Sequence, residues 1–339
     1  MMHPPSNENT RVIAVTVTYA SRRPLLMQAL QAASRERVHA IVVVDNGSDW
    51  DVKELEQLPA LPPITVISLP SNVGSAGGFS AGMRVACQMN AEFAWILDDD
   101  NVPSEGCLAA LLSRHKLEEP KCDGITAMLA YRPEHQPLIA TNAPKGEINH
   151  RRSSFLGFHV LDLPRKIWRR SKLGALERRE PGTDPVRLDY APYSGMLIRL
   201  NDLIKIGFPR EDFILYADDS EWSYRITATG GRILLLPEAK MEDIESSWNV
   251  KEDFGSSMAA LLMGPGDARA YYAARNSTFF FNHSMGGSRA MKALNRAVYL
   301  LILSAMSARL RAQQRHSILK RAITDGLAGK LGKSGKFSL

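Results

Sequence analysis

Residues 91–100 read AEFAWILDDD, a short apolar run that ends abruptly in three carboxylates. The apolar part has the length and composition of a buried β-strand. Three adjacent carboxylates repel one another, so a fold that keeps them together must supply a cation or hydrogen-bond donors. Oxygen ligands of this kind favour Mg²⁺ or Mn²⁺, and Mg²⁺ commonly binds through one or two carboxylates plus substrate phosphates. A solvated acidic turn or helix cap is the alternative interpretation.

The same strand signal recurs along much of the chain. Short apolar runs bounded by polar, Gly or Pro residues predict strands at residues 12–17, 40–44, 64–69, 93–97, 124–130, 195–199 and 232–236. Helices are predicted at residues 24–34, 79–90, 201–206, 268–282 and 288–314, and another begins near Asp218. This alternation predicts an α/β protein with a mainly parallel, Rossmann-like sheet, helices on both faces, and a C-terminal helical region.

The polar residues that end these strands should meet at one rim of the sheet, because ligands of such sheets bind beyond the carboxyl ends of the strands. Thr18 and Tyr19 follow the first strand, Asp45 follows the second, and the acidic triplet follows the fourth. The rim is therefore the expected ligand site.

A glycine-rich segment, NVGSAGGF at residues 72–79, precedes the second predicted helix. Closely spaced glycines let a backbone approach phosphates, and a helix N-terminus adds favourable amide dipoles. The spacing is not the dinucleotide fingerprint, and it follows the third strand signal rather than the first, which disfavours a standard NAD site. A purely steric role for the glycines is the alternative.

Acidic residues also gather in YADDSEWSYR at residues 216–225, where a helix is predicted to begin. Carboxylates there are stabilised by the helix dipole, and Glu221 with Arg225 has the spacing of an ordinary surface ion pair. That account does not explain Asp218 and Asp219, which lie amid apolar and aromatic residues. A carboxylate in partly apolar surroundings is a candidate general base.

The composition is that of a folded globular protein, with 339 residues, 45% of them apolar and 23% charged. These values exclude a disordered, collagen-like or coiled-coil chain. Three cysteines without paired spacing support neither a disulfide scaffold nor a zinc-thiolate site. The first ten residues lack the pattern of an export signal, and the longest apolar run, residues 297–308, is shorter than the ~20 residues that cross a bilayer. We therefore expect a cytosolic protein.

The net charge of +6 hides two basic segments. Residues 151–180 carry nine Arg or Lys against three acids, residues 287–339 carry eleven against one, and the remainder sums to −10. Basic segments attract phosphate-rich partners such as nucleic acid or anionic lipid headgroups. The sequence has no helix-turn-helix, RNA-binding signature or zinc finger, which disfavours nucleic acid. A merely solvated basic face is the alternative.

Taken together, these segments resemble the family 2 glycosyltransferases, inverting enzymes with the GT-A nucleotide-sugar-binding fold. The matching segments, in chain order, are VTVTY, IVVVDNGS, NVGSAGGFSAGMR, WILDDD, SGMLI, GFPREDFILYADDSEWSYR and YYAARN. The resemblance spans residues 11–248 and extends more weakly through residues 271–276. Within the family, the WILDDD and YADDSEW forms are most similar to bacterial galactofuranosyltransferases and, next, rhamnosyltransferases of cell-wall, O-antigen and capsule assembly.

The resemblance implies roles for individual residues. The donor nucleotide would be held by Thr18, Tyr19, Asp45, Asn72, Gly77, Gly78, Arg84, Asp98, Asp99 and Arg275. In this set, Asp45 matches a position that binds the base, and Asp98 lies nearer the ribose. Asp98 and Asp100 match the metal motif, with Asp100 as the direct ligand of Mn²⁺ or Mg²⁺. Asp219 matches the catalytic base, and Asp218 and Glu221 match acids that hold the acceptor.

The sequence departs from the family pattern in one place. Related enzymes often carry a metal-binding His six residues beyond the proline of a VPxAxxxH stretch. The corresponding run here is LPEAKMED at residues 236–243, so Asp243 takes the position of that His. An oxygen ligand there is compatible with Mg²⁺ or Mn²⁺. Glu242 is the alternative if the alignment shifts by one residue.

The resemblance also implies an activity and a domain plan. Residues 1–115 would bind the nucleotide-sugar, residues 116–250 would bind the acceptor and carry catalysis, and residues 251–339 would form a basic helical region. The expected reaction is metal-dependent inverting transfer, with UDP-galactofuranose favoured as donor and dTDP-rhamnose as the alternative. A non-catalytic nucleotide-sugar binding protein is the rival of another class.

Two features point to a lipid-linked saccharide acceptor and an anionic membrane surface. One is RKIWRR at residues 165–170, with Phe155, Phe158 and Trp168 nearby, and the other is the apolar run 298–303 between Arg296 and Arg309. Basic residues beside aromatic and aliphatic ones suit the membrane interface. We therefore expect a peripheral location on the inner face of the cytoplasmic membrane. Packing of residues 298–303 on the catalytic body, or a contact within a homo-oligomer, is the alternative.

Overall fold

The computed structural model describes residues 10–136, 148–169, 182, 184–245, 254 and 256–337. Its strands are β1 (Val12–Ala20), β2 (Ala40–Ser48), β3 (Ile64–Ser68), β4 (Phe93–Ile96), β5 (Asn101–Pro103), β6 (Thr126–Tyr131), β7 (Val186–Leu188), β8 (Met196–Arg199) and β9 (Arg232–Asp243). Its α-helices are α1 (Arg23–Arg35), α2 (Gly74–Ala86), α3 (Cys107–Glu118), α6 (Leu163–Arg169), α7 (Leu200–Ile206), α8 (Asp218–Ala228), α10 (Ser257–Met263), α11 (Asp267–Phe279), α12 (Arg289–Arg309) and α13 (Gln313–Leu327). Shorter turns of helix are η1 (Val52–Gln57), η2 (Glu119–Lys121), η3 (Val160–Asp162), η4 (Glu211–Phe213) and η6 (Phe280–Ser284).

The sheet has nine strands in the described part of the chain, in the order β3-β2-β1-β4-β8-β6-β9-β5, with β7 paired to β9. β1 pairs in parallel with β2 and β4, β2 with β3, and β6 with β9. β8 runs antiparallel to β4 and β6, and β5 and β7 run antiparallel to β9. The carboxyl ends of β1, β2, β4, β6 and β9 therefore lie at one edge, together with the start of β8.

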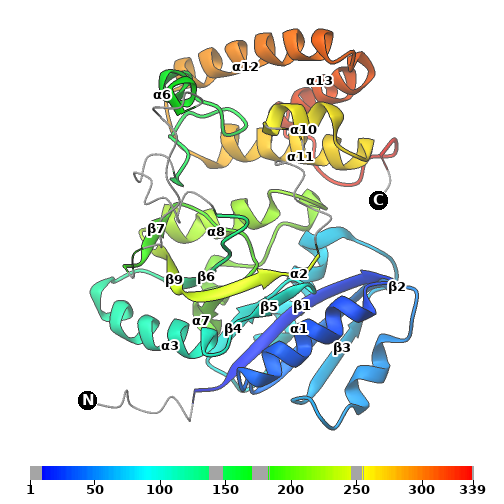
Figure 1. Cartoon of the computed structure of the whole chain (residues 1–339), viewed down its shortest axis with the longest axis vertical. Helices are drawn as coiled ribbons and strands as arrows, with labels where there is room; N and C mark the ends of the chain where they lie inside the picture. The colour runs from blue at the N-terminus through cyan, green and yellow to red at the C-terminus, as the bar shows by residue number, and fades with distance from the viewer. Residues whose placement is uncertain are drawn as a thin grey trace.

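Alternate side chains of the strands pack against helices on both faces of the sheet. On one face, Ile13 and Val15 of β1 join a buried core with α2, α7 and α8. On the other face, Val12 and Ala14 join a core with α1, α3 and η1. The prediction of an α/β fold with helices on both faces and a helical C-terminal region is confirmed (Figure 1).

Helix α2 begins at Gly74, five residues before the predicted start, so the glycine-rich segment is largely helical. Gly78 faces β1, because a Cβ added there would lie 2.6 Å from Cγ1 of Val17. Gly82 faces β1 in the same way, since a Cβ added at that position would lie 2.7 Å from Cγ1 of Val15. The steric alternative therefore accounts for Gly78, since a larger residue would separate α2 from the sheet.

The helices after residue 256 form a second unit at one end of the sheet, with α12 on its outer side (Figure 1). The predicted helix 288–314 is interrupted, because α12 ends at Arg309 and α13 begins at Gln313. Within the apolar run, Tyr299 and Leu303 are buried against the other helices, whereas Leu301 is 71% exposed. No helix in the described residues is long and apolar enough to cross a membrane.

The membrane interpretation expected Phe155 and Phe158 on the surface, but neither side chain lies there. Both side chains are buried, and their rings pack edge-on against Tyr299 of α12 at 5.3 and 6.0 Å between centroids. They attach the segment before α6 to α12. Trp168 is 58% exposed, while the end of RKIWRR and the rest of the basic segment up to residue 180 lie largely outside the described residues.

Candidate active site

Side chains from five strand ends converge at one edge of the sheet, which we call the acidic rim: Thr18, Asp45, the triplet Asp98–Asp100, Arg132 and Asp243. Thr18 of β1 is paired in register with Asp45 of β2. The triplet follows β4, Arg132 follows β6, and Asp243 ends β9. The convergence follows from the topology, because all five strands run in the same direction.

The first two acids of the triplet have strong partners. Asp98 accepts a hydrogen bond from the Ser194 hydroxyl, which lies just before β8. Burial raises the pKa of Asp98 to about 6, although this hydrogen bond acts against the shift. Asp99 accepts from Nε and Nη2 of Arg22, each at 2.8 Å, in a bidentate pair.

Asp100 is the least compensated acid of the triplet. Its nearest side-chain donors among the described residues are Nη2 of Arg22 at 3.3 Å and the Asn101 amide at 3.4 Å, both long contacts. Burial, followed by the charges of Asp98, Asp99 and Asp243, raises its pKa to about 7. A buried carboxylate with weak partners and like charges around it leaves room for a cation.

Asp243 is already engaged. One of its oxygens accepts from Asn101 at 2.7 Å, and the other accepts from Arg132 and His135, both at 2.8 Å. Burial alone would raise the pKa of Asp243, but the hydrogen bond from His135 and the charge of Arg132 hold it below its ordinary value. Asp243 thus anchors two cationic side chains, and His135 brings a histidine to the rim from a different element than the family pattern.

A metal ion fits the donor chemistry of the triplet, though the protein encloses no complete site. In the described residues, no three His, Cys, Asp or Glu side chains are grouped to hold a metal. The free capacity belongs to Asp100 and, through its second oxygen, Asp98. Two carboxylates are sufficient where substrate phosphates supply further ligands, as is common for Mg²⁺.

Asp218 and Asp219 begin α8, and their positions differ. Asp218 is 2% exposed and accepts from the Ser75 hydroxyl of α2 at 2.9 Å. Burial and then the charge of Asp219 raise the pKa of Asp218 to about 7. Asp219 is more exposed, and one of its oxygens caps the Ser220 amide at 2.6 Å while burial raises its pKa. Asp219 is therefore the more accessible carboxylate of the pair.

Glu221 is paired within α8 rather than with either aspartate. Its carboxylate forms a bidentate ion pair with Arg225 one turn along α8, at 2.5 Å for the shorter contact. Arg225 also donates to the carbonyls of Ile206 and Phe208. Glu221 and Arg225 thus form an ordinary i, i+4 ion pair on a helix. With this partner, Glu221 has little capacity left for an acceptor.

The expected nucleoside side of the rim is organised by Asn46, which follows Asp45 near the end of β2. Its amide oxygen accepts from Val73 N at 2.9 Å, and its nitrogen donates to Gly74 O at 3.1 Å. Asn72 caps Gly74 N at 2.9 Å, and Asp45 accepts from Ser48 N at 2.9 Å. These bonds fix the loop before α2 against the end of β2, which lies beside the end of β1 that carries Thr18 and Tyr19.

The structure does not bring Arg84 and Gly77 to the rim. Arg84 lies in the last turn of α2, ten residues or about 15 Å from the helix start. Its guanidinium covers the ring of Phe208 at 4.3 Å and lies 3.9 Å from Glu211. A Cβ at Gly77 would lie 2.6 Å from Val73, so that glycine relieves crowding inside the first turns of α2.

Arg275 is buried in the helical unit, with 1% of its surface exposed. Its Nη1 donates to Gly332 O at 2.6 Å, and its Nη2 lies within 3.4 Å of the carbonyls of Asp212 and Phe213. The neighbouring Asn276 donates to the carbonyls of Phe213, Leu215 and Tyr216. We call this pair the loop anchor, because it binds the backbone immediately before α8. With these partners, Arg275 has little capacity left for a phosphate.

Two arginines at the rim were missed by sequence reasoning. Arg22 contacts Asp99 and Asp100, donates to Glu245 at 2.6 Å and lies over the ring of Tyr19. Arg132 is 9% exposed, and its Nε is buried with no hydrogen-bond partner among the described residues. Both come shortly after predicted strands, so their position beyond a strand end was the available signal. A buried donor of this kind needs a partner such as an ordered water, an ion or a ligand.

Comparison with known proteins matches residues 14–173 to the family described as Glycosyl transferase family 2. Galactofuranosyltransferase GlfT1 of Mycolicibacterium smegmatis is 36% identical over 118 residues, which cover 33% of this chain and 38% of the relative. Galactofuranosyltransferase GlfT1 of Mycobacterium tuberculosis is 28% identical over 230 residues, which cover 65% of each chain. The chain thus spans less than two thirds of the length of these relatives.

Two solved structures have a similar fold. S. aureus TarS 1–349 in complex with UDP-GlcNAc superposes with a TM-score of 0.52 at 12% identity, covering 94% of this chain and 82% of that one. GalNAc-T7 with UDP, GalNAc and Mn²⁺ superposes with a TM-score of 0.51 at 14% identity, covering 86% of this chain and 55% of that one. Both likenesses concern the fold, which is the GT-A fold.

Proposed function

We propose that this chain, whose residues 14–173 match Glycosyl transferase family 2, transfers a sugar from a nucleotide-diphosphate donor to an acceptor hydroxyl. The observation that carries the proposal is the acidic rim, with its under-compensated triplet at one edge of a GT-A sheet, together with the partly buried Asp219, which is close enough to Arg132 of the rim for that charge to act on its pKa. Galactofuranose is the favoured sugar, because curated relatives are galactofuranosyltransferases.

The donor's diphosphate would lie between the triplet and Arg132. Asp100 and Asp98 would hold Mn²⁺ or Mg²⁺, which, when bound, neutralises the charge of the departing nucleotide diphosphate. Arg132 offers a buried Nε–H that has no other partner among the described residues. Thr18, Tyr19 and Asp45 remain our proposal for the nucleoside side, because they share the rim with these charged groups.

Asp219 would remove the proton from the acceptor hydroxyl as that oxygen attacks the anomeric carbon. Its raised pKa increases its strength as a base, and Asp218, held by Ser75, keeps the start of α8 in place. A single displacement inverts the anomeric centre and needs no covalent intermediate. No nucleophile other than the acceptor is required.

The acceptor is proposed to be a lipid-linked saccharide at the cytoplasmic membrane surface. The support is the outer side of the helical unit, where Leu294 and Leu301 of α12 are exposed and no acid occurs in the helix. Basic residues at both ends of α12, Arg289 and Arg309, would meet anionic headgroups. We propose a peripheral location on the inner face of that membrane.

The test is transfer and donor hydrolysis with purified protein, UDP-galactofuranose and a synthetic lipid-linked acceptor. We expect release of UDP that depends on Mn²⁺ or Mg²⁺ and is lost in EDTA. dTDP-rhamnose in the same assay tests the second donor. Donor binding without any turnover would instead support a non-catalytic nucleotide-sugar binding protein, and full activity in EDTA would refute the metal role.

A further inference from the structure

The segment that follows α13 returns from the helical unit to the sheet. We call residues 329–337 the α13 extension. The amide of Gly332 donates to Asp212 O at 2.6 Å, and the Gly332 carbonyl accepts from Nη1 of Arg275 in α11, also at 2.6 Å. Asp212 belongs to η4, in the loop before α8. The extension is therefore bound to α11 on one side and to the loop before α8 on the other.

The residue that follows Lys333 in the extension is also fixed. Ser334 N donates to the Tyr272 hydroxyl at 2.9 Å, and that hydroxyl donates to Phe337 O at 3.1 Å. The ring of Phe337 stacks on Tyr271 with 4.3 Å between the centroids. Because its neighbours on both sides are bound, the backbone of Lys333 has a defined position.

The side chain of Lys333 reaches the loop before α2. Its Nζ donates to Asn72 O at 3.4 Å, although the two residues are 261 positions apart in the chain. Asn72 itself lies against the end of β2, because Asn46 donates to its side chain at 3.3 Å and a Cβ added at Gly47 would lie 3.3 Å from its backbone nitrogen. Lys333 thus lies beside the loop that borders the expected nucleoside side of the rim.

The Lys333 ammonium has hydrogen-bonding capacity left. A lysine ammonium carries three donors, and this side chain is exposed. Its contact with Asn72 is long, and in the part of the chain that the structure describes it forms no ion pair. One long hydrogen bond adds little to the bonds that already hold Gly332 and Ser334. The ammonium is therefore available to a ligand.

A second cation of the helical unit acts on the same side of the rim. Burial raises the pKa values of Tyr19 and Tyr216, and the positive charge of Arg269 in α11 acts against both shifts. Tyr19 lies near the end of β1. The helical unit thus brings positive charge to the nucleoside side, which the side chains of Arg84 and Arg275 do not reach.

We propose that Lys333 binds the nucleoside part of the donor, through a hydrogen bond from its ammonium to an oxygen of the base or the ribose. The helical unit then completes a donor site whose other residues belong to the sheet. The inference rests on the proposed function, because it assigns a further residue to the same nucleotide-sugar. The nucleoside carries these oxygens whatever sugar is attached, so the contact does not depend on the identity of the sugar.

The first test is titration of UDP and UMP into the unmodified protein and Lys333→Gln in the presence of Mn²⁺. We expect Lys333→Gln to weaken binding of both nucleotides about tenfold, roughly the effect of one charge-assisted hydrogen bond. UMP keeps the nucleoside and lacks the terminal phosphate, so an equal loss locates the contact away from that phosphate. A loss confined to UDP would overturn the proposal in favour of a phosphate contact.

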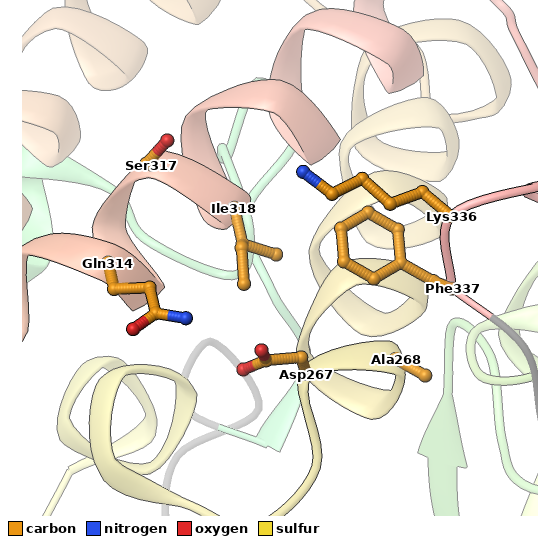
Figure 2. A pocket seen from close by; sticks show the side chains of 7 residues that line it. All are labelled: Asp267, Ala268, Gln314, Ser317, Ile318, Lys336 and Phe337. Carbon is orange, nitrogen blue, oxygen red and sulfur yellow. The ribbon is translucent and has the colours of Figure 1, made fainter.

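Lys336 provides the matched control, because it belongs to the same extension. Its side chain lines a cavity of about 470 Å³ between α11 and α13, together with Asp267 and Phe337 (Figure 2). Lys336→Gln removes the same charge, and we expect both affinities to stay within about twofold. Equal losses in the two variants would overturn the proposal in favour of diffuse charge attraction.

Lysine labelling separates a ligand contact from a purely structural role. Acetylation of exposed lysines, followed by peptide mass spectrometry, should be slowed at Lys333 by saturating UDP and unchanged at Lys336. Labelling of Lys333 that does not respond to UDP would overturn the proposal. So would a Lys333→Gln variant that melts at a lower temperature but binds UDP like the unmodified protein, since the bond to Asn72 would then only hold the extension.

Kinetics keep this result separate from the proposed function. Lys333→Gln should raise KM for UDP-galactofuranose about tenfold and leave kcat nearly unchanged, because the contact is made before and during the reaction alike. Failure of the unmodified protein to bind UDP would refute the proposed function and this inference together. Binding and transfer by the unmodified protein, with the same UDP affinity in Lys333→Gln, would refute this inference alone.

Discussion

The acidic rim and the loop anchor both bury charged side chains, and they satisfy that charge in different ways. Arg275 of the loop anchor is surrounded by backbone carbonyls and by the Asn276 side chain. Asp100 of the rim is surrounded by other carboxylates and has only long contacts to donors among the described residues. A buried charge with complete partners builds the fold, whereas a buried charge without them marks a binding site.

The two regions are nevertheless connected through one loop. Asn276 and Arg275 bind the carbonyls of residues 212–216, and Asp218 and Asp219 follow two and three residues later. The loop contains left-handed residues at Ile214, Tyr216 and Ala217, which cost energy without such support. The anchor therefore holds the backbone before Asp218 and Asp219 in position.

The largest effect should follow from Asp219→Asn, which removes the proton acceptor at constant size. We expect turnover to fall by about 10² to 10⁴ while UDP affinity changes little. Glu221→Gln is the control, because its partner is Arg225, and it should reduce turnover far less. An active Asp219→Asn with an inactive Asp218→Asn would assign the base to the buried acid instead.

The next effect concerns metal and pH at Asp100, whose folded pKa of about 7 exceeds the unfolded value of about 4. Because the folded state holds the proton of Asp100 more tightly, the contribution of this group to stability should be greatest at low pH, fall between about pH 4 and about pH 7, and then level off. Mn²⁺ should raise the melting temperature mainly at the upper end of this range, where the acid is charged.

Asp100→Asn provides the matched variant for the melting experiment. It should weaken both the pH dependence and the response to Mn²⁺, and it should abolish metal-dependent transfer. A response to Mn²⁺ of equal size in this variant would place the ion elsewhere. EDTA treatment of the unmodified protein gives the reference without bound metal.

Arg275→Lys in the loop anchor should have a smaller effect. It should change stability rather than the rate of the chemical step. Lysine keeps the charge but loses the planar donors that reach Gly332 and Phe213. We expect a loss of about 2–4 kcal/mol in the free energy of unfolding by urea, with UDP affinity retained under native conditions. The control is Arg321→Lys, which changes an exposed arginine that is paired with Asp325. It should change stability by less than about 0.5 kcal/mol.

The sequence predicted the central strands because buried strands need continuous apolar runs, and runs of that kind stand out between polar turns. It missed β5 and β7, which have only three residues each. It also located the carboxylates at the rim, since residues after parallel strands must share an edge. Helix α2 was misplaced because its glycines were assigned to a loop, whereas Gly78 is helical and allows α2 to approach Val17. Local composition alone does not distinguish these two uses of glycine.

The partners of the charged residues were harder to predict than their positions. Arg22 and Asp99 are 77 residues apart, and Arg132 and Asp243 are 111 apart, so only the folded sheet brings each pair together. Arg275 was assigned to a phosphate because a motif carries no information on burial. Its carbonyl partners come from the loop before α8 and from Gly332.

The smallest effect should follow from Arg84→Ala. This variant extends the comparison of buried charges in the rim and the loop anchor to a charge that is exposed. Arg84 lies about 15 Å along α2 from the helix start, is 55% exposed, and contacts Phe208 and Glu211 rather than the rim. Exposed contacts of this kind contribute at most about 1 kcal/mol, so UDP affinity should stay within about twofold. Arg132→Gln, which removes the buried donor at the rim, should weaken UDP binding at least tenfold in the same titration, roughly the effect of one charge-assisted hydrogen bond. If Arg84→Ala were the variant that lost UDP, the diphosphate would lie along α2, and the orphaned Nε of Arg132 would need another ligand.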